Sequence, residues 1–170
     1  LIAAKPGEPW LIWCGLNDEA DAIVQAVPGT VNVEGKNSTE FKIKNLLGFC
    51  KGDPLRLATK GKIAGRGMNW QHCRNMIFLG MNDSFEQLFQ GVRRCWRFGQ
   101  TGAVNVYMIA SELEGAVVKN LHAKERKYEA MADARAGHMR ELTRNAVRGG
   151  RLVTTKYEPK QTMRLPTWLR

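Results

Sequence analysis

Residues 55–69 read LRLATKGKIAGRGMN, a short apolar run that leads into a glycine-rich turn. Leu55 to Thr59 has the length and character of a buried strand, and Gly61 to Gly67 marks a turn directly after it. Glycines 65 and 67 allow positive φ and a close approach of the backbone to a ligand. Because ligands of parallel sheets bind beyond the carboxyl ends of the strands, this stretch predicts a strand and a candidate site next to it.

The same alternation of strand and helix continues on both sides of this stretch. Four further strands are predicted, at residues 10–14, 30–33, 75–80 and 104–110. Helices are predicted at about residues 17–27, from Ser38 to about residue 52, at 84–96 and at 112–147. Their expected signals are a cap at Asn17 or Asp18, a capping box of Ser84 with Gln87, and an interruption at Gly137. Short connections between such elements predict an α/β fold, a parallel sheet with helices on both faces.

Composition places the chain among ordinary globular proteins. Apolar residues make up 44% of its 170 residues and charged residues 25%. No apolar run approaches the roughly 18 residues that span a membrane, so no membrane partner is expected. The N-terminus lacks the features of a signal peptide, and it also lacks an initiator Met, which leaves open that the chain is part of a longer one. We expect a cytoplasmic protein.

The four cysteines carry no metal or disulfide signature. None belongs to a CxxC pair, so free buried thiols are expected in a reducing compartment. His72 and Cys73 are adjacent, but neighbouring residues rarely reach one metal and no second pair stands at zinc-finger spacing. No metal site is predicted.

Positive charge is concentrated in the last third of the chain. Residues 1–114 carry 13 Lys and Arg against 11 Asp and Glu, a net charge of +2. Residues 115–170 carry 13 against 5, a net charge of +8. Such a segment suits a polyanionic partner through phosphate contacts, and it equally suits the solvated face of a helix. Charge alone does not decide between the two.

Two stretches imitate nucleotide-binding motifs. Asp18-Glu-Ala-Asp21 spells an acidic box, but it stands at the start of a predicted helix, where acidic residues complement the dipole. Gly29 to Lys36 imitates a phosphate loop, but its spacing is one residue too long and Asn37 replaces the magnesium-binding hydroxyl. We interpret the first as helix capping and the second as a turn.

Residues 90–100 read QGVRRCWRFGQ and form the second informative stretch. On the predicted helix, Arg94 and Arg97 are three residues apart and share a face, so both can engage one phosphate group. An arginine offered to a transferring phosphoryl group stabilises its negative charge. Taken alone, this stretch also suits a salt-bridged surface helix, and the glycine-rich turn also suits an ordinary turn.

Order and spacing favour the functional interpretation of both stretches. The sequence Thr-Lys, Gly-x-Gly-x-Asn, a strand, and Gln-x₃-Arg-x₂-Arg-x-Gly-Gln resembles motifs V and VI of superfamily 2 helicases, in the version used by Swi/Snf-type ATPases. It is especially similar to phage-encoded helicase proteins of that branch. Residues 10–14 stand where motif IV would be, and the resemblance covers roughly residues 8–112. Arg93 replaces the usual acidic residue of motif VI, and Trp96, which we expect to pack under the sheet, replaces the usual histidine.

The resemblance implies roles for individual residues. The expected catalytic residues are Arg97 as arginine finger, Arg94 as a second γ-phosphate contact and Gln90, which positions the nucleotide or the attacking water. The expected nucleotide-side residues are Gly65, Gly67 and Asn69. The expected nucleic-acid contacts are Thr59, Lys60 and Lys62.

The resemblance also implies an organisation and a function. Residues 1–112 would form the second RecA-like lobe of an ATP-dependent DNA helicase or translocase. Residues 113–147 would form a helical extension that braces the sheet or projects toward DNA or the other lobe, and residues 148–170 an extended basic tail. ATP and Mg²⁺ would bind only together with a first lobe, in the same chain or a separate one, and not to this chain alone. DNA is the expected nucleic acid, with RNA not excluded, and the host cytoplasm the expected location if a phage encodes the protein. The alternative is a non-catalytic module that binds nucleic acid or a partner.

Overall fold

The computed structural model describes residues 1–65, 67–80, 83–111 and 114–147. The predicted boundary at residue 112 and the predicted tail at 148–170 lie outside these residues. The chain divides into two compact units, Leu1–Lys127 and Tyr128–Arg170. The first unit contains the whole sheet and the candidate site.

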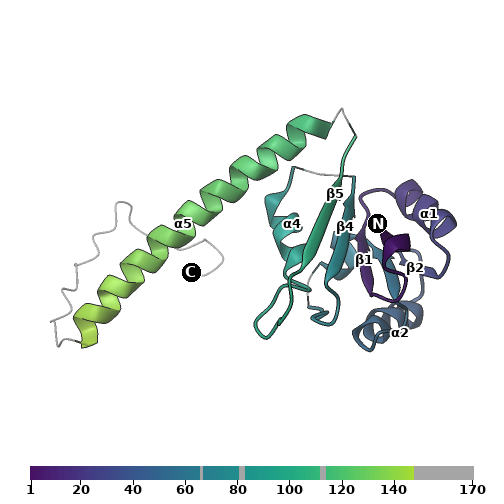
Figure 1. Ribbon diagram of the computed structural model, residues 1–170, viewed down its shortest axis with the longest axis horizontal. Coiled ribbons are helices and arrows are strands. Elements are labelled where there is room, and N and C mark those ends of the chain that lie inside the picture. Colours follow the sequence, from purple (N-terminus) through teal and green to yellow (C-terminus); the bar gives the residue numbers. More distant parts are fainter. Residues whose placement is uncertain (66, 81–82, 112–113, 148–170) are drawn as a thin grey trace, which may run out of the picture. The chain divides into compact units, whose positions relative to one another are not determined.

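The first unit is built on a five-stranded parallel sheet in the order β2-β3-β1-β4-β5 (Figure 1). Its strands are short and lie within one or two residues of the predicted positions: β1 Trp10–Trp13, β2 Thr30–Val33, β3 Arg56–Thr59, β4 Asn75–Leu79 and β5 Asn105–Ile109. β1 is central, with Trp10 paired to Arg56 on one side and to Asn75 on the other. The predicted α/β fold is confirmed.

Alternate residues of β1 face opposite sides of the sheet, as the period of a strand requires. Leu11 and Trp13 enter a core with α2 (Thr39–Cys50), α3 (Gly61–Ala64) and α4 (Phe85–Val92). Trp10 and Ile12 enter a second core with the 3₁₀ turn η1 (Ile2–Ala4) and α1 (Asn17–Ala26). The sheet is therefore covered on both faces.

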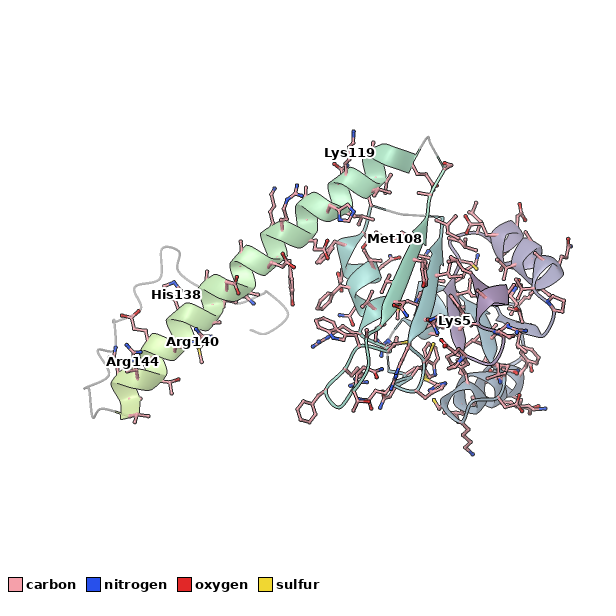
Figure 2. The ribbon with its side chains drawn as sticks, in the orientation of Figure 1. Lys5, Met108, Lys119, His138, Arg140 and Arg144 are labelled. Carbon is pink, nitrogen blue, oxygen red and sulfur yellow. The ribbon has the colours of Figure 1, made fainter. Side chains whose placement is uncertain are left out.

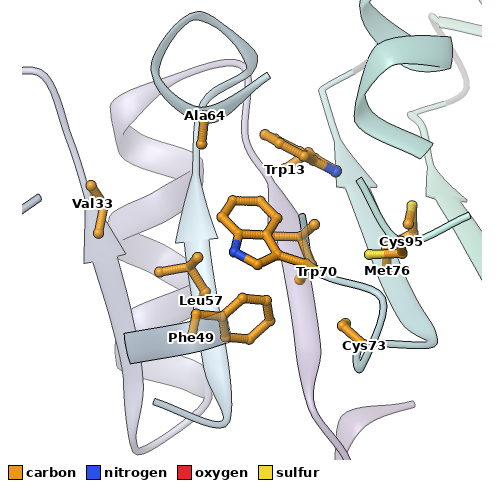
Figure 3. Packing of buried hydrophobic residues seen from close by; sticks show 10 residues of the cluster. Trp13, Val33, Phe49, Leu57, Ala64, Trp70, Cys73, Met76 and Cys95 are labelled. Atoms are coloured by element: carbon orange, nitrogen blue, oxygen red, sulfur yellow. The ribbon is translucent and has the colours of Figure 1, made fainter. Parts of the chain in front are cut away.

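The first core contains three buried aromatic side chains that come from different parts of the fold (Figure 3). Trp70 is fully buried, with its ring 5.4 Å from that of Phe49 and 6.2 Å from that of Trp13. Its indole Nε1 donates a hydrogen bond to the carbonyl oxygen of Leu46 on α2, at 3.3 Å. Because Trp70 follows the glycine-rich turn by only three residues, this core holds the segment after that turn against the sheet.

The helix boundaries confirm two predicted caps and correct three other predictions. Ser38 and Ser84 accept hydrogen bonds from the N–H groups of Phe41 and Gln87, as N-caps do. α1 is capped differently from the prediction: its N-cap is Leu16, and the Glu19 carboxylate accepts from Gly15 and Leu16 N–H. The predicted helix over 84–96 is too long, because α4 ends at Val92. Gly137 does not interrupt α5 (Gly115–Val147).

Both imitations of nucleotide motifs have structural roles. The carboxylate of Glu19 caps α1, as described above. After β2, Lys36 pairs with the buried Glu34 at 2.8 Å, and this contact lowers the pKa of Glu34. The N–H of Asn37 donates to the carbonyl oxygen of Glu34 at 3.3 Å, so the predicted turn after β2 is confirmed.

α5 carries basic side chains along its length. Lys119 lies in the first unit, and His138, Arg140 and Arg144 lie in the second (Figure 2). The buried Leu121 is the only α5 residue in the core among the residues that the structure describes. No helix within the described ranges is long and apolar enough to cross a membrane.

Candidate functional site

The carboxyl ends of β1, β3 and β4 meet at one edge of the sheet. A narrow cavity there has a volume of about 60 Å³, and its lining includes Trp13, Gly15, Gly61 and Gly80. Ligand pockets usually measure about 300 Å³ or more, so this cavity is too small for a nucleotide. The other candidate residues lie outside this cavity, on the segments that follow β3 and α4.

The glycine loop, residues 60–65 and 67–71, follows β3. Lys60 is half-buried and caps the short α3, while Lys62 and Asn69 are exposed. Gly67 has φ +85°, which favours glycine, and a β-carbon at Gly65 would collide with the Gly61 carbonyl oxygen. Both predicted glycine positions therefore require glycine for the backbone itself.

Thr59 lies immediately before the glycine loop and is fully buried. Its hydroxyl donates to the carbonyl oxygen of Val33 on β2, at 3.0 Å. The side chain is thus used inside the sheet. Its predicted contact with a nucleic-acid backbone stays a prediction.

The arginine turn, residues 93–100, follows α4 and contains the two predicted catalytic arginines. The predicted shared helix face is wrong, because both residues lie beyond the end of α4. Arg94 is 7% exposed, whereas Arg97 is exposed. The two arginines therefore differ in what they can contact.

Arg94 binds the glycine loop. Its Nε donates to the carbonyl oxygen of Gly65 at 3.0 Å, and one terminal nitrogen donates to the same oxygen. The other terminal nitrogen donates to the carbonyl oxygen of Met68 at 2.9 Å. In return, the Arg94 carbonyl accepts the N–H of Trp70 at 2.8 Å. Burial and the charge of Arg97 lower the pKa of Arg94. The predicted phosphate contact of Arg94 stays a prediction.

Two glutamines add a second connection between the glycine loop and the arginine turn. Gln100 Nε2 donates to the carbonyl oxygen of Gln71 at 2.7 Å and to that of Cys95 at 3.2 Å. Gln71 Nε2 donates to the carbonyl oxygen of Phe98. Neither amide was predicted to have a role, because such pairing between distant segments leaves no local pattern in the sequence.

Arg97 lies at a hollow of about 440 Å³, which is within the size range of ligand pockets. The residues that line it are Phe89, Gln90, Arg93, Arg94, Arg97 and Phe98. Three are arginines and none is acidic, so the hollow suits an anion. The predicted catalytic residues Gln90, Arg94 and Arg97 are thus brought together in one hollow.

Arg93 and Trp96 depart from the usual residues of motif VI. The Arg93 guanidinium carbon lies 5.5 Å from the centre of the Phe89 ring and 5.4 Å from that of the Trp96 ring, a cation–π arrangement. Trp96 is 52% exposed, so the expectation that it packs under the sheet is wrong. The turn beyond α4 directs Trp96 outward, where it covers Arg93.

The predicted nucleic-acid residue Lys62 lies at a different hollow from Arg97. That hollow is lined by Lys62, Lys124 and residues 83–87. Lys124, on the first turns of α5, forms an ion pair with Asp83 at 2.7 Å. Lys124 was not predicted as a site residue, since its position depends on the path of the chain after β5.

The described residues contain no group of three or more His, Cys, Asp and Glu side chains that could hold a metal ion. All four cysteines are free. Burial raises the pKa of the Cys14 thiol to about 12, and Cys95, buried against Cys73, also has a raised pKa. These thiols are structural.

Comparison with known proteins supports the fold. No protein-family model and no curated protein matches the sequence. Among solved structures, the chain is similar to the crystal structure of the C-terminal part of the Fun30 ATPase domain, with a TM-score of 0.59 and 19% sequence identity. The match covers 71% of this chain and 41% of the Fun30 chain. The fold therefore resembles that of the C-terminal part of the Fun30 ATPase domain.

Proposed function

We propose that this chain is the second lobe of a nucleic-acid-dependent ATPase of the Swi/Snf-type branch of superfamily 2, a helicase or translocase motor. The observation that carries the proposal is the arginine turn: Arg97 is exposed at a cationic hollow, and the turn is hydrogen-bonded to the glycine loop beyond β3. The fold of the Fun30 C-terminal part supports the same conclusion. In such a motor, ATP lies between this lobe and a first lobe.

In the proposed motor this lobe contributes positive charge to phosphoryl transfer. ATP supplies the phosphoryl group, and the resemblance assigns its phosphate loop and Mg²⁺ to the first lobe. Arg97 would approach the γ-phosphate from the opposite side and stabilise the charge that spreads over its oxygens. Gln90, which lines the same hollow, would orient the nucleotide or the attacking water. Gly67 and Asn69 would face the cleft between the lobes, beside the ribose.

Nucleic acid would bind to the glycine loop. Lys60 and Lys62 begin this loop, and their ammonium groups suit the phosphate backbone of DNA or RNA. Closure of the lobes on ATP and their opening after hydrolysis would move the strand across both lobes. Arg97 lies at a hollow different from that of Lys62, so the proposed lobe would bind the two ligands on separate surfaces.

The test is reconstitution. The 170-residue chain alone is expected to hydrolyse ATP at the background rate, because it supplies only one side of the site. Together with a first lobe, in the native polypeptide or as an added protein, it should hydrolyse ATP when DNA is present. Magnesium-dependent turnover by the chain alone would contradict the proposal, and so would a first lobe whose turnover is indifferent to this chain.

The second candidate function is a binding module without catalysis. The net charge of +8 on residues 115–170 favours it, because such a segment binds polyanions without any ATPase. DNA binding that depends steeply on salt, survives loss of Arg97 and is unaffected by ATP and a first lobe would support this module over the motor.

A further inference from the structure

Arg94 and Arg97, both in the arginine turn, differ in their surroundings: Arg94 is buried and Arg97 is exposed. Arg94 directs all three guanidinium nitrogens at two carbonyl oxygens of the glycine loop, those of Gly65 and Met68. Hydrogen bonds from a charged group are about twice as strong as neutral ones. To reach a phosphate, Arg94 would have to release these bonds and leave buried groups without partners.

These bonds also fix the direction of the loop backbone. In a trans peptide the N–H points opposite to the C=O. Because the Met68 carbonyl accepts from Arg94, the N–H of Asn69 in the same peptide points away from it. The adjacent positive charge polarises this peptide and strengthens its N–H as a donor. Arg94 thereby presents a loop amide on the side remote from its own side chain.

The loop is held at its far end as well. The Trp70 N–H donates to the Arg94 carbonyl, and Gln100 donates to the carbonyl of Gln71. Displacement of the arginine turn would therefore pull on the glycine loop at Gly65, Met68 and Trp70 together. The glycine loop and the arginine turn are therefore expected to move together, with Arg97 exposed at the surface of the turn.

We propose that Arg94 is a positioning residue that holds the glycine loop in its binding conformation and links it to Arg97, which alone of the two contacts phosphate. The functional part of this inference rests on the proposed motor. The structural part does not. It replaces the direct phosphate contact that the resemblance implies for Arg94 with an indirect role.

The structural part is tested on the 170-residue chain by amide hydrogen exchange. Arg94→Lys keeps the charge but cannot reproduce the forked set of three hydrogen bonds, so exchange in residues 67–71 should accelerate at least about tenfold, as expected for loss of one or more charged hydrogen bonds. Arg97→Lys is the matched control and should leave this exchange unchanged. α1, on the opposite face of the sheet, reports global unfolding in both variants. Unchanged loop exchange in Arg94→Lys would overturn the proposal.

If Arg94→Lys does not fold, the wild type still provides a measurement. The Arg94 Nε–H is buried and donates to Gly65, so its proton should exchange slowly in the free chain and remain protected when ATP binds to the complete motor. Loss of this protection on nucleotide binding would mean that Arg94 leaves the loop for the phosphate, which contradicts a positioning role.

The functional part is tested in the complete motor by separating KM from kcat. Arg97→Ala should lower kcat with little change in the KM for ATP. Arg94→Lys should raise the KM for ATP and weaken the stimulation of turnover by DNA, because it loosens the loop on which both depend. If Arg94 instead contacted the phosphate directly, Arg94→Lys would retain more of kcat than Arg94→Ala, because lysine keeps the positive charge. If Arg97→Ala leaves turnover intact, the proposed function fails, while the exchange result for Arg94 still stands or falls by itself.

Discussion

Replacement of Thr59 by valine separates the structural role of this residue from its predicted contact with nucleic acid. Valine has nearly the same shape but lacks the hydroxyl that donates to the Val33 carbonyl oxygen at 3.0 Å. Loss of a buried hydrogen bond that leaves its acceptor unpaired costs about 1–2 kcal/mol. For a unit of this size, we expect a fall in Tm of roughly 3–8 °C. Thr59→Ser, which keeps the hydroxyl, is the matched control.

The same variant should leave DNA affinity nearly unchanged, since the Thr59 side chain has no exposed surface. The paired change Lys60→Ala with Lys62→Ala should instead weaken binding and reduce the slope of log Kd against log salt by about one for each phosphate that is no longer neutralised. Lys51→Ala, at the end of α2 and the opposite edge of the sheet, is the matched lysine control. Thermal unfolding and titration of a labelled DNA duplex measure both effects. A tenfold loss of affinity in Thr59→Val, with Lys60 and Lys62 dispensable, would refute this reasoning.

Two further predictions concern the core and the thiols. Trp70→Phe should lower the free energy of unfolding in urea by about 2–3 kcal/mol, because it removes the hydrogen bond to Leu46 and part of the ring that fills the first core. A change below about 0.5 kcal/mol would show that Trp70 does not hold the glycine loop. Because the pKa of Cys14 is about 12, only about one Cys14 thiol in 10⁴ is ionised at pH 8. Cys14 should therefore resist iodoacetamide in the folded chain and react after denaturation, as followed by mass spectrometry. Alkylation of folded Cys14 at the rate of a free thiol would contradict its burial.

The sheet was predictable because its signals are local. β1 is a run of four buried apolar residues, and Ser38 and Ser84 each cap the helix that follows them. Turn residues between these elements marked where each strand or helix ends and the next one begins. A parallel sheet with helices on both faces follows from such an alternation.

The end of α4 was not predictable, because its cause is tertiary. Apart from Gly91, which lies inside α4, nothing between Gln90 and Phe98 disfavours a helix strongly, yet the chain turns after Val92. The turn lets the Arg94 carbonyl accept from Trp70, and it buries the Arg94 guanidinium against the glycine loop. These partners lie more than 20 residues away in sequence. The error about Trp96 has the same origin, since the turn places this side chain outside.

The helix caps show a smaller limitation of the same kind. Asn17 and Asp18 are good capping residues, but the N-cap is Leu16, and the Glu19 side chain accepts from the N–H groups of Gly15 and Leu16, just before the helix. A single glycine in a helix costs only about 1 kcal/mol, so Gly137 does not end α5. In both cases the sequence allowed more than one local structure, and a prediction from residue propensity alone was wrong.

The measurement that tests the central claim most directly is DNA-stimulated ATP hydrolysis by the complete motor, with wild type compared to Arg97→Ala. Arg74→Ala is the matched control, because Arg74 is an exposed arginine that precedes β4 and does not line the hollow at which Arg97 lies. An arginine finger contributes about 10³-fold or more to the rate. We predict a loss of that order for Arg97→Ala with DNA binding retained, and near wild-type turnover for Arg74→Ala. Wild-type turnover in Arg97→Ala would contradict the assignment of this chain as the catalytic partner lobe of an ATPase.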